Sequence, residues 1–205
     1  ALRNALRNFV LGGAELQGEN KQRYAAIQER MAELSQKFSE NALDATDRFS
    51  LFVTEAELAG VPEDVKNTAR AAAEKEGHSG YKLTLKMPCY LPVMQFAASS
   101  ELRQKLYQAY VTRASDQADA QFAELDNGKL IQEILQLRQE EAKLLGYQNF
   151  AEVSVATKMA DSPAKVIAFL RDLSMRARPF AEKDLQDMRQ FATEHLNLQN
   201  PQAWD

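Results

Sequence analysis

The 205-residue sequence has one cysteine, one tryptophan, two histidines and few residues that break regular structure. Its eight glycines and six prolines make up about 7% of the chain, against roughly 12% in average proteins. So few turn-forming residues cannot separate many short strands, and a mainly α fold is therefore predicted. The lone Cys89 excludes an internal disulfide, which favours a reducing, cytoplasmic location.

Long apolar runs and an excess of one charge are also absent. No apolar run approaches the roughly 18 residues of a membrane span, and Arg3 and Arg7 interrupt the apolar positions of the first ten residues. Basic and acidic residues number 25 and 29 and are interspersed, which gives a net charge of −4. We therefore expect no membrane anchor, no secretory signal and no nucleic-acid partner.

Helical periodicity is present through most of the chain. Apolar residues between Asn20 and Thr46 step by three and four positions, so they share one face of a helix. Similar spacing predicts further helices near residues 63–76, 102–110, 130–144, 149–158 and 162–195. Pro179 lies inside the last of these and predicts a kink near Arg178, because proline removes a helical hydrogen bond.

Two short segments alternate apolar and polar residues instead. They predict strands at about 48–54 and 81–87, and these could pair as a small two-stranded β element. Thr54 and Glu57 have the spacing of a capping box. No fixed-period repeat, low-complexity linker or compositional break divides the chain, so residues 1–205 are predicted to form a single helical region.

The two histidines are weak candidates for metal binding, because they are far apart in sequence and neither belongs to an H-x-x-x-H pattern. His78 lies in the turn from Gly77 to Gly80, where a solvated side chain is the simpler explanation. His195 falls near the end of the last predicted helix, where a cation complements the helix dipole.

Ser162 and Lys165 match the S-x-x-K pattern of serine acyl-transfer enzymes. A serine directly before Pro163 is also an ordinary helix N-cap, and this second interpretation is favoured. Gly12-Gly13 and the segment 127–130 lack the spacing of nucleotide-binding motifs.

Paired carboxylates and one aromatic face complete the candidates. Glu133, Glu140 and Glu141 could serve acid–base chemistry, but a solvated helix surface is the default; Glu141 falls in the apolar stripe and is predicted to be buried or at an interface. Tyr107, Tyr110 and Arg113 could line a groove or could pack in the core with their polar tips outward. We assign no catalytic, cofactor-binding or metal-ligating residue on these patterns.

Several blocks taken together resemble one family, the oligopeptidase A branch of the thimet-oligopeptidase-like zinc metallopeptidases. Their order and spacing match the family over nearly the whole chain. The blocks are 41–46, 57–63, 83–94, 110–116, 133–135, 144–146, 156–160, 176–179 and 204–205.

The resemblance implies a cytoplasmic enzyme that hydrolyses short unstructured peptides, including cleaved signal peptides, in a deep channel between two largely helical halves. In this family a helix with H-E-x-x-H supplies two zinc ligands and the general base. This sequence contains no H-E-x-x-H, so no catalytic or metal residue can be carried over to it. Zinc is expected in the full-length parent, and none is expected to bind these 205 residues.

The chain begins without Met in a helical pattern and stops at Trp204-Asp205. We therefore expect an N-terminal or middle portion of a larger metallopeptidase, inert alone, that builds part of the channel wall beside the missing catalytic domain of the same chain. The face of Tyr107, Tyr110 and Arg113 and the strand from Tyr81 to Met87 are candidates to face the channel. The alternative is a free-standing helical protein–protein interaction module that docks a partner on an apolar groove.

Overall fold

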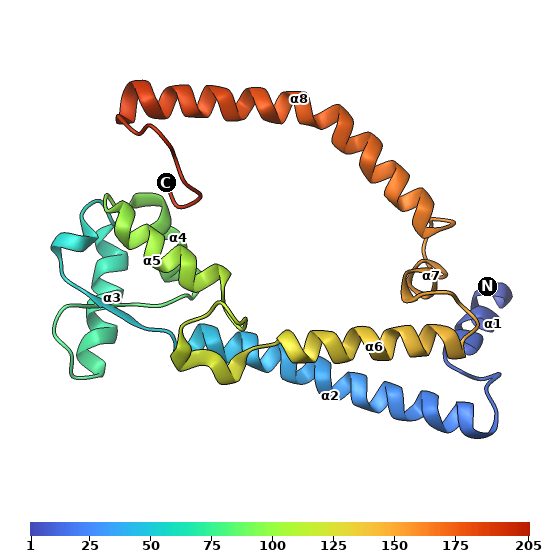
Figure 1. Ribbon diagram of the computed structural model, residues 1–205. Coiled ribbons are helices and arrows are strands. Elements are labelled where there is room, and N and C mark those ends of the chain that lie inside the picture. Colours follow the sequence, from blue (N-terminus) through green and yellow to red (C-terminus); the bar gives the residue numbers. More distant parts are fainter. The chain divides into compact units, whose positions relative to one another are not determined.

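The computed structural model describes residues 1–205, which form eight α-helices, two 3₁₀ helices and a two-stranded sheet (Figure 1). The mainly α prediction is confirmed. The α-helices are α1 (Leu2–Leu11), α2 (Gly18–Arg48), α3 (Glu63–Lys75), α4 (Met87–Phe96), α5 (Ser100–Val111), α6 (Gly128–Leu144), α7 (Phe150–Val155) and α8 (Pro163–Leu196). The short elements are β1 (Leu51–Val53), η1 (Ala56–Leu58), β2 (Tyr81–Leu83) and η2 (Ala120–Leu125).

These elements form two compact units. Unit 1 consists of Ala1–Gln36 and Leu130–Gln199, and unit 2 consists of Lys37–Lys129 and Asn200–Asp205. The long helix α2 contributes its first part to unit 1 and its second part to unit 2. None of the helices combines the length and the hydropathy that crossing a lipid bilayer requires.

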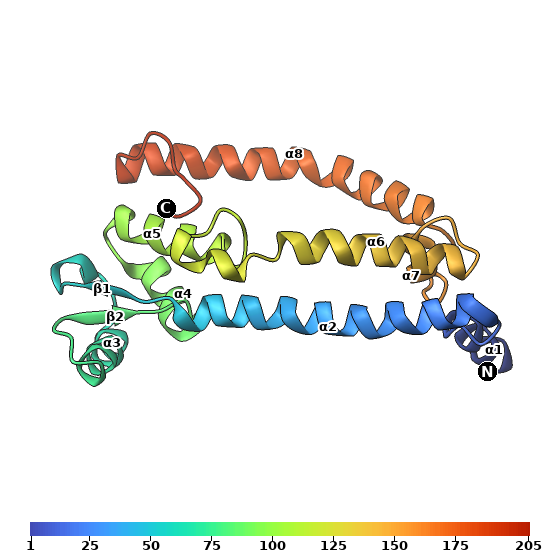
Figure 2. The ribbon, with the colours of Figure 1, turned by 60° about the horizontal axis from the view of Figure 1, so that its bottom comes forward.

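In unit 1 the first part of α2 lies beside α6 (Figure 2). Ile27 and Leu34 of α2 and Leu137 of α6 are buried together, as the predicted apolar stripes require. Helix α8 contributes little to this core, because Ala192 is its only buried residue. It runs for 34 residues through Pro179 without a break, and it bends along its course (Figure 1).

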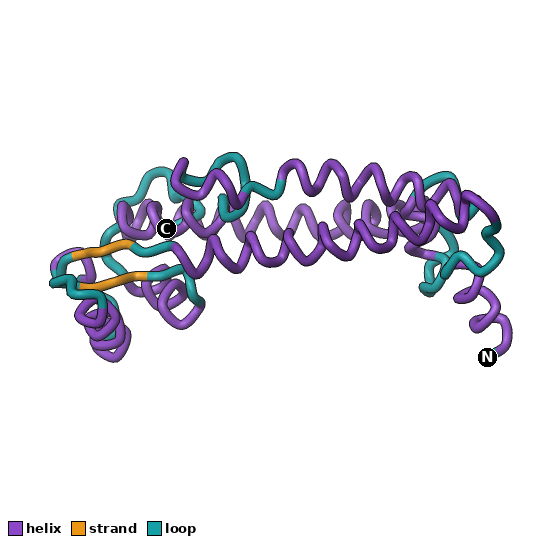
Figure 3. Tube along the Cα trace, turned by 90° about the horizontal axis from the view of Figure 1, so that it is seen from below, coloured by secondary structure: helices purple, strands orange, loops and turns teal.

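In unit 2 the two strands pair antiparallel, with Leu51 opposite Leu83 and Val53 opposite Tyr81 (Figure 3). The predicted β element is confirmed, but both strands are shorter than the alternating pattern predicts. The second strand ends early because residues 84–86 leave the ladder and Met87 begins α4.

Helix α4 is a helix that the sequence did not predict, because it lies between the predicted strand at 81–87 and the next predicted helix at 102–110. Pro88 lies in the first turn of α4, where a backbone N–H has no helical acceptor in any case, so it fits the helix start. Pro92 is accommodated inside the helix. Neither proline therefore prevents this ten-residue helix.

The main core of unit 2 gathers the sheet, α3, α4 and α5 around fully buried side chains such as Leu58, Leu83 and Leu106. Gly60 makes this packing possible: its φ is +88°, and an added Cβ would lie 2.2 Å from the carbonyl oxygen of Phe96. The close approach is held by a 2.8 Å hydrogen bond from the Ala98 backbone N–H to the Ala59 carbonyl.

Residues 200–205 are fixed to α5 through Arg103. Its guanidinium donates to the carbonyl of Trp204 at 2.6 Å and to the carboxylate of Asp205 at 2.9 Å. The Trp204 ring lies 5.8 Å from the Tyr107 ring. Hydrogen bonds, first from Ser100 and then from the Gln202 backbone and Arg103, hold the pKa of Asp205 below its usual value.

Candidate functional site

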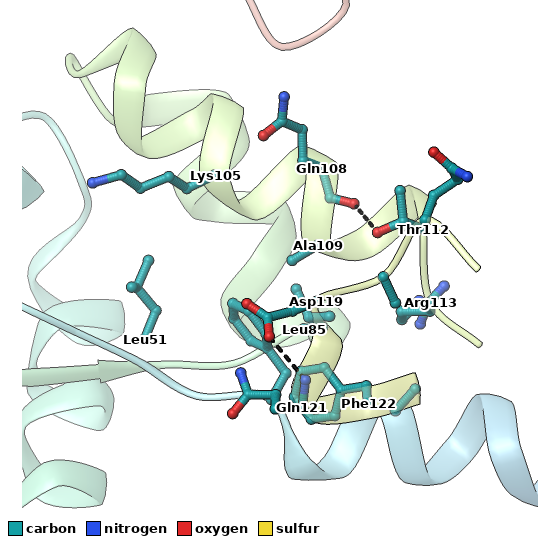
Figure 4. Close-up of a pocket in the computed structure, with 14 residues that line it drawn as sticks. Leu51, Leu85, Lys105, Gln108, Ala109, Thr112, Arg113, Asp119, Gln121 and Phe122 are labelled. Atoms are coloured by element: carbon teal, nitrogen blue, oxygen red, sulfur yellow. Dashed lines mark hydrogen bonds between the residues drawn. The ribbon is translucent and has the colours of Figure 1, made fainter. Parts of the chain in front are cut away.

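A cavity of about 520 Å³ in unit 2 is the best-formed candidate site (Figure 4). Helix α5 supplies one wall, with Lys105, Gln108 and Thr112. The loop from Arg113 to Asp119 and the short helix η2 supply the other side. Apolar side chains also line the cavity: Phe49, Leu51, Leu85, Ala109 and Phe122.

Helix α5 presents its polar side to this cavity because its apolar side is already committed to the core. Ser99 caps the helix by accepting a hydrogen bond from the Leu102 N–H at 3.2 Å. Leu102 and Leu106 are buried on the core side. The wall residues named above are spaced three and four positions apart and so share another face.

Arg113 is held firmly at the edge of the cavity. Its guanidinium carbon lies 3.7 Å from the centre of the Tyr110 ring, and its Nη1 donates to the Thr46 hydroxyl at 2.7 Å. Nε donates to the Tyr110 carbonyl at 2.8 Å. The Tyr110 ring stacks in turn on Tyr90, with centroids 4.3 Å apart, and burial raises the pKa of Tyr90.

Of the aromatic face predicted from sequence, the structure therefore brings only Arg113 to the cavity. Tyr110 packs between Tyr90 and the guanidinium, and Tyr107 packs against Trp204. Of the two predicted alternatives, the two tyrosines therefore follow packing and do not line a groove. The predicted strand segment contributes Leu85 alone to the cavity lining, while Tyr81 and Leu83 are buried in the core.

A buried amide pair fixes the loop side of the cavity to α2. Asn41 Nδ2 donates to Asn127 Oδ1 at 2.9 Å, and Asn127 Nδ2 donates to the carbonyl of Phe38 at 3.0 Å. Both asparagines are 2% exposed. Asn127 also donates its backbone N–H to Ala114, a non-glycine residue with φ of 51°. Asn127 is thereby a structural residue, in agreement with the poor nucleotide-motif spacing around it.

The cavity combines charge with an apolar lining. Lys105 and Arg113 are cations, and Asp119 is a carboxylate whose oxygen also accepts from the Gln121 N–H at 3.0 Å. Hydrogen bonds from Thr54 hold the pKa of Glu57 below its usual value, and the nearby Lys105 charge lowers it further. The lining thus offers ion pairing, amide hydrogen bonds and apolar contact, which are the interactions that an extended peptide can use.

The two histidines lie in different units. His78 in unit 2 is exposed and its ring lies 4.1 Å from Phe52, whereas His195 in unit 1 is exposed and lies 4.6 Å from Phe191. No three His, Cys, Asp or Glu side chains converge as a ligand set.

The glutamates of α6 pair with arginines of α2. Arg23 binds Glu140 through two hydrogen bonds of 2.6 Å, and Arg30 binds Glu133 at 2.7 and 3.0 Å. Hydrogen bonds from these arginines hold the pKa of both glutamates below the usual value. These carboxylates therefore join two helices as ion pairs.

Glu141 is buried, as its place in the apolar stripe predicts, with 7% of its surface exposed. One carboxylate oxygen accepts from Gln28 Nε2 at 3.0 Å, and the other has no hydrogen-bond partner. The neighbouring Tyr24 donates its hydroxyl to the Leu11 carbonyl at 2.8 Å; burial first, and then the Glu141 charge, raises the pKa of Tyr24.

The S-x-x-K pattern is an N-cap in the structure. The Ser162 hydroxyl accepts from the Lys165 backbone N–H at 3.2 Å at the start of α8. The Lys165 ammonium pairs with Asp161, not with the serine. The capping interpretation is confirmed.

The cavity residues of α5 and its following loop were the main omission of the sequence-based reasoning. The available signal was the polar stripe of Lys105, Gln108 and Thr112 opposite the buried leucines of the same helix. The contributions of Phe49 and Leu85 had no local signal, because they come from segments far away in the sequence.

Comparison with known proteins gives one family match and several relatives. Residues 93–205 match peptidase family M3. The whole chain is 47% identical over 206 residues to oligopeptidase A of Salmonella typhimurium and 48% identical over 206 residues to oligopeptidase A of Escherichia coli. A probable cytosolic oligopeptidase A of Arabidopsis thaliana is 39% identical over 195 residues, which cover 91% of this chain. The chain spans about 30% of the length of the two bacterial relatives and 27% of the plant relative.

Proposed function

Because the chain belongs to peptidase family M3, we propose that it is a non-catalytic helical part of a zinc-dependent oligopeptidase that hydrolyses short peptides. The identity of 47% and 48% to two bacterial oligopeptidases A over the whole chain carries this proposal. Since the chain spans about 30% of those relatives, most of such an enzyme would lie outside these residues.

In this proposal the zinc ligands and the general base belong to that other part of the enzyme. The residues present here do not fit a zinc site, because no three ligating side chains converge and each histidine lies against a phenylalanine ring. Zinc bound elsewhere would activate water and polarise the scissile carbonyl. The residues of this chain would bind and confine the peptide.

The proposed role in the enzyme is to form part of the wall of a deep substrate channel. A narrow passage admits an extended peptide and rejects a folded domain, so the wall needs a rigid shape and few specific side chains. The cavity of unit 2 suits that role, since its walls are pinned by the Arg113 and Asn127 contacts. Lys105, Gln108 and Thr112 would then contact the peptide.

The proposed partners are short unstructured peptides, including cleaved signal peptides, and the catalytic domain of the same chain. The proposed location is the cytoplasm, which the single unpaired cysteine, Cys89, favours.

Hydrolysis of a quenched fluorescent peptide of about ten residues, with added zinc and parallel metal analysis, tests the proposal. The longer chain should cleave the peptide and hold stoichiometric zinc, and the 205-residue chain should do neither. Zinc-dependent turnover by the 205 residues alone would contradict the non-catalytic role. Absence of turnover from both chains would favour the free-standing interaction module.

A charge reversal in the cavity tests the channel-wall role. In the longer chain, Lys105→Glu should raise KM for an acidic peptide by up to about fivefold, because an exposed ion pair contributes little binding energy. It should leave kcat unchanged. Lys75→Glu on α3 is the matched control, because that lysine is exposed and does not line the cavity. Equal KM values for the two variants would argue against contact between the cavity and the substrate.

A further inference from the structure

Helix α8 carries large apolar side chains that nothing in the structure covers. They recur at helical spacing, so most share one face of the helix. We call six of them the α8 stripe: Phe169, Leu170, Leu173, Phe180, Met188 and Phe191, whose side chains are 65%, 54%, 51%, 73%, 56% and 56% exposed.

Such a helix needs a partner for physical reasons. Helices in proteins owe most of their stability to the packing of an apolar face, and α8 buries only Ala192 along its 34 residues. Contiguous exposed apolar surface marks an interaction site. The α8 stripe therefore has the composition of an interface.

The charges of α8 exclude a simple electrostatic partner. Three ion pairs each join residues one turn apart on α8 or at its start: Asp161 with Lys165, Asp172 with Arg176, and Arg178 with Glu182. Of these side chains, Arg176 borders the stripe, because it lies four residues before Phe180. Six basic and five acidic side chains are interspersed along α8, so the helix has little net charge to attract a polyanion or an anionic membrane.

Two acidic residues without an ion pair, Asp184 and Asp187, fall within the stripe, and Asp187 lies four residues before Phe191. Asp184 lies four residues from both Phe180 and Met188, so all three share a face, and Asp184 is exposed without an ion-pair partner. A surface that covers the stripe must leave Asp184 in water or supply a basic group.

We propose that the α8 stripe is the docking surface for the part of a longer chain that these 205 residues do not include, through an apolar face with a basic side chain opposite Asp184. This inference rests on the proposed function. The length of the relatives supports the choice of occupant, because about 70% of each bacterial relative lies outside the matched segment. Helix α8 also lies wholly within the residues that match the peptidase family, 93–205.

Thiol labelling in the longer chain tests this docking surface. Cys89 is replaced by serine, any other cysteine is removed, and a single cysteine is introduced by Phe180→Cys on the stripe or by Gln186→Cys on another face. Gln186 is exposed and has no ion pair, so it is the matched control. With an uncharged maleimide, Phe180→Cys should react at least tenfold more slowly than Gln186→Cys in the longer chain, and both should react alike in the 205-residue chain.

Two outcomes would overturn the proposal. Equal rates in the longer chain would show an uncovered stripe. Protection of Phe180→Cys in the 205-residue chain that grows with protein concentration would assign the stripe to a second copy. If Phe180→Cys disrupts folding, judged by circular dichroism, Leu173→Cys serves as the second stripe position and the same comparison applies.

The labelling experiment is independent of catalysis, because it needs neither zinc nor peptide. A protected stripe in a chain without peptidase activity would uphold the docking surface and reject the proposed function. An active enzyme with an unprotected stripe would uphold the proposed function and reject the docking surface.

Discussion

Leu106 anchors the helix that forms the cavity wall, and it is fully buried in the core of unit 2. Leu106→Ala should lower the free energy of unfolding by about 2–5 kcal/mol, because the change removes apolar contact and leaves a cavity. Leu43→Ala on α2 is the control with the same chemistry, since Leu43 is 60% exposed. Urea unfolding measures both; similar losses for the two variants would contradict the burial described for α5.

Substitution of Ser162 distinguishes its role as a helix N-cap from a role as a nucleophile. Ser162→Ala should cost about 1 kcal/mol of stability at the start of α8, because it removes the acceptor for the Lys165 N–H. Hydrogen exchange at the first turn of α8 measures this effect. Ser162→Asp, which retains a capping oxygen, should restore most of the protection. Peptide hydrolysis by the longer chain should not change, and its loss in Ser162→Ala would favour the acyl-transfer interpretation.

For single residues, the sequence predicted the features that depend on residues nearby in the chain. The cap at Ser162 follows from the adjacent Pro163, and the burial of Glu141 follows from its place in a helical stripe. The position of Arg113 did not follow, because it depends on Thr46, 67 residues away, and on stacking with Tyr110. Contacts between distant segments leave no periodic signal.

Among the elements, α2 and α6 are joined by the ion pairs of Arg23 with Glu140 and Arg30 with Glu133. Both glutamates have a pKa below the ordinary value of 4.5. Their contribution is therefore complete above about pH 4.5 and is lost as the pH falls through the lowered pKa values. Thermal unfolding between pH 7 and pH 3 should show this loss.

The double variant Glu133→Gln/Glu140→Gln isolates the contribution of these pairs. Its unfolding temperature should depend less steeply on pH below 4.5 than that of the unmodified chain. The effect should be small and should shrink with added salt, because all four side chains are 40–50% exposed. Identical slopes for the two proteins would show that the pairs do not stabilise the packing of α2 on α6.

Long periodic elements were predicted well, and short ones were not. The helices α2, α6 and α8 have many turns of consistent spacing, so their periodicity outweighs local exceptions such as Pro179. Helix α4 was missed because nearly all of its ten residues are apolar or proline, so it shows no amphipathic period. The predicted strands are longer than the observed ones, because the alternation of apolar and polar residues continues beyond the paired residues.

At the scale of the whole molecule, the division into two units had no signal in the sequence. No break in composition along the chain marks the boundary, which falls inside the continuous helix α2. The division arises from which distant segments pack together. Local patterns in a single sequence do not show which distant segments pack together.

Exposed apolar surface predicts how the 205-residue chain behaves in solution. It should strongly enhance the fluorescence of the dye anilinonaphthalene sulfonate, because the α8 stripe offers uncovered apolar side chains. The double variant Leu173→Ser/Phe180→Ser should reduce this signal, and Gln186→Ser should not. A dye-silent, strictly monomeric chain would argue for a self-contained interaction module.

The discontinuity of unit 1 also sets an order of events during synthesis. Arg23 can pair with Glu140 only after the ribosome has added a further 117 residues. Their synthesis takes about 6–23 s at 5–20 residues per second. The contiguous segment Lys37–Lys129 of unit 2 emerges during that interval. The first part of α2 therefore leaves the ribosome with an apolar face whose partner helix has not yet been made, and such exposed apolar surface is prone to aggregation.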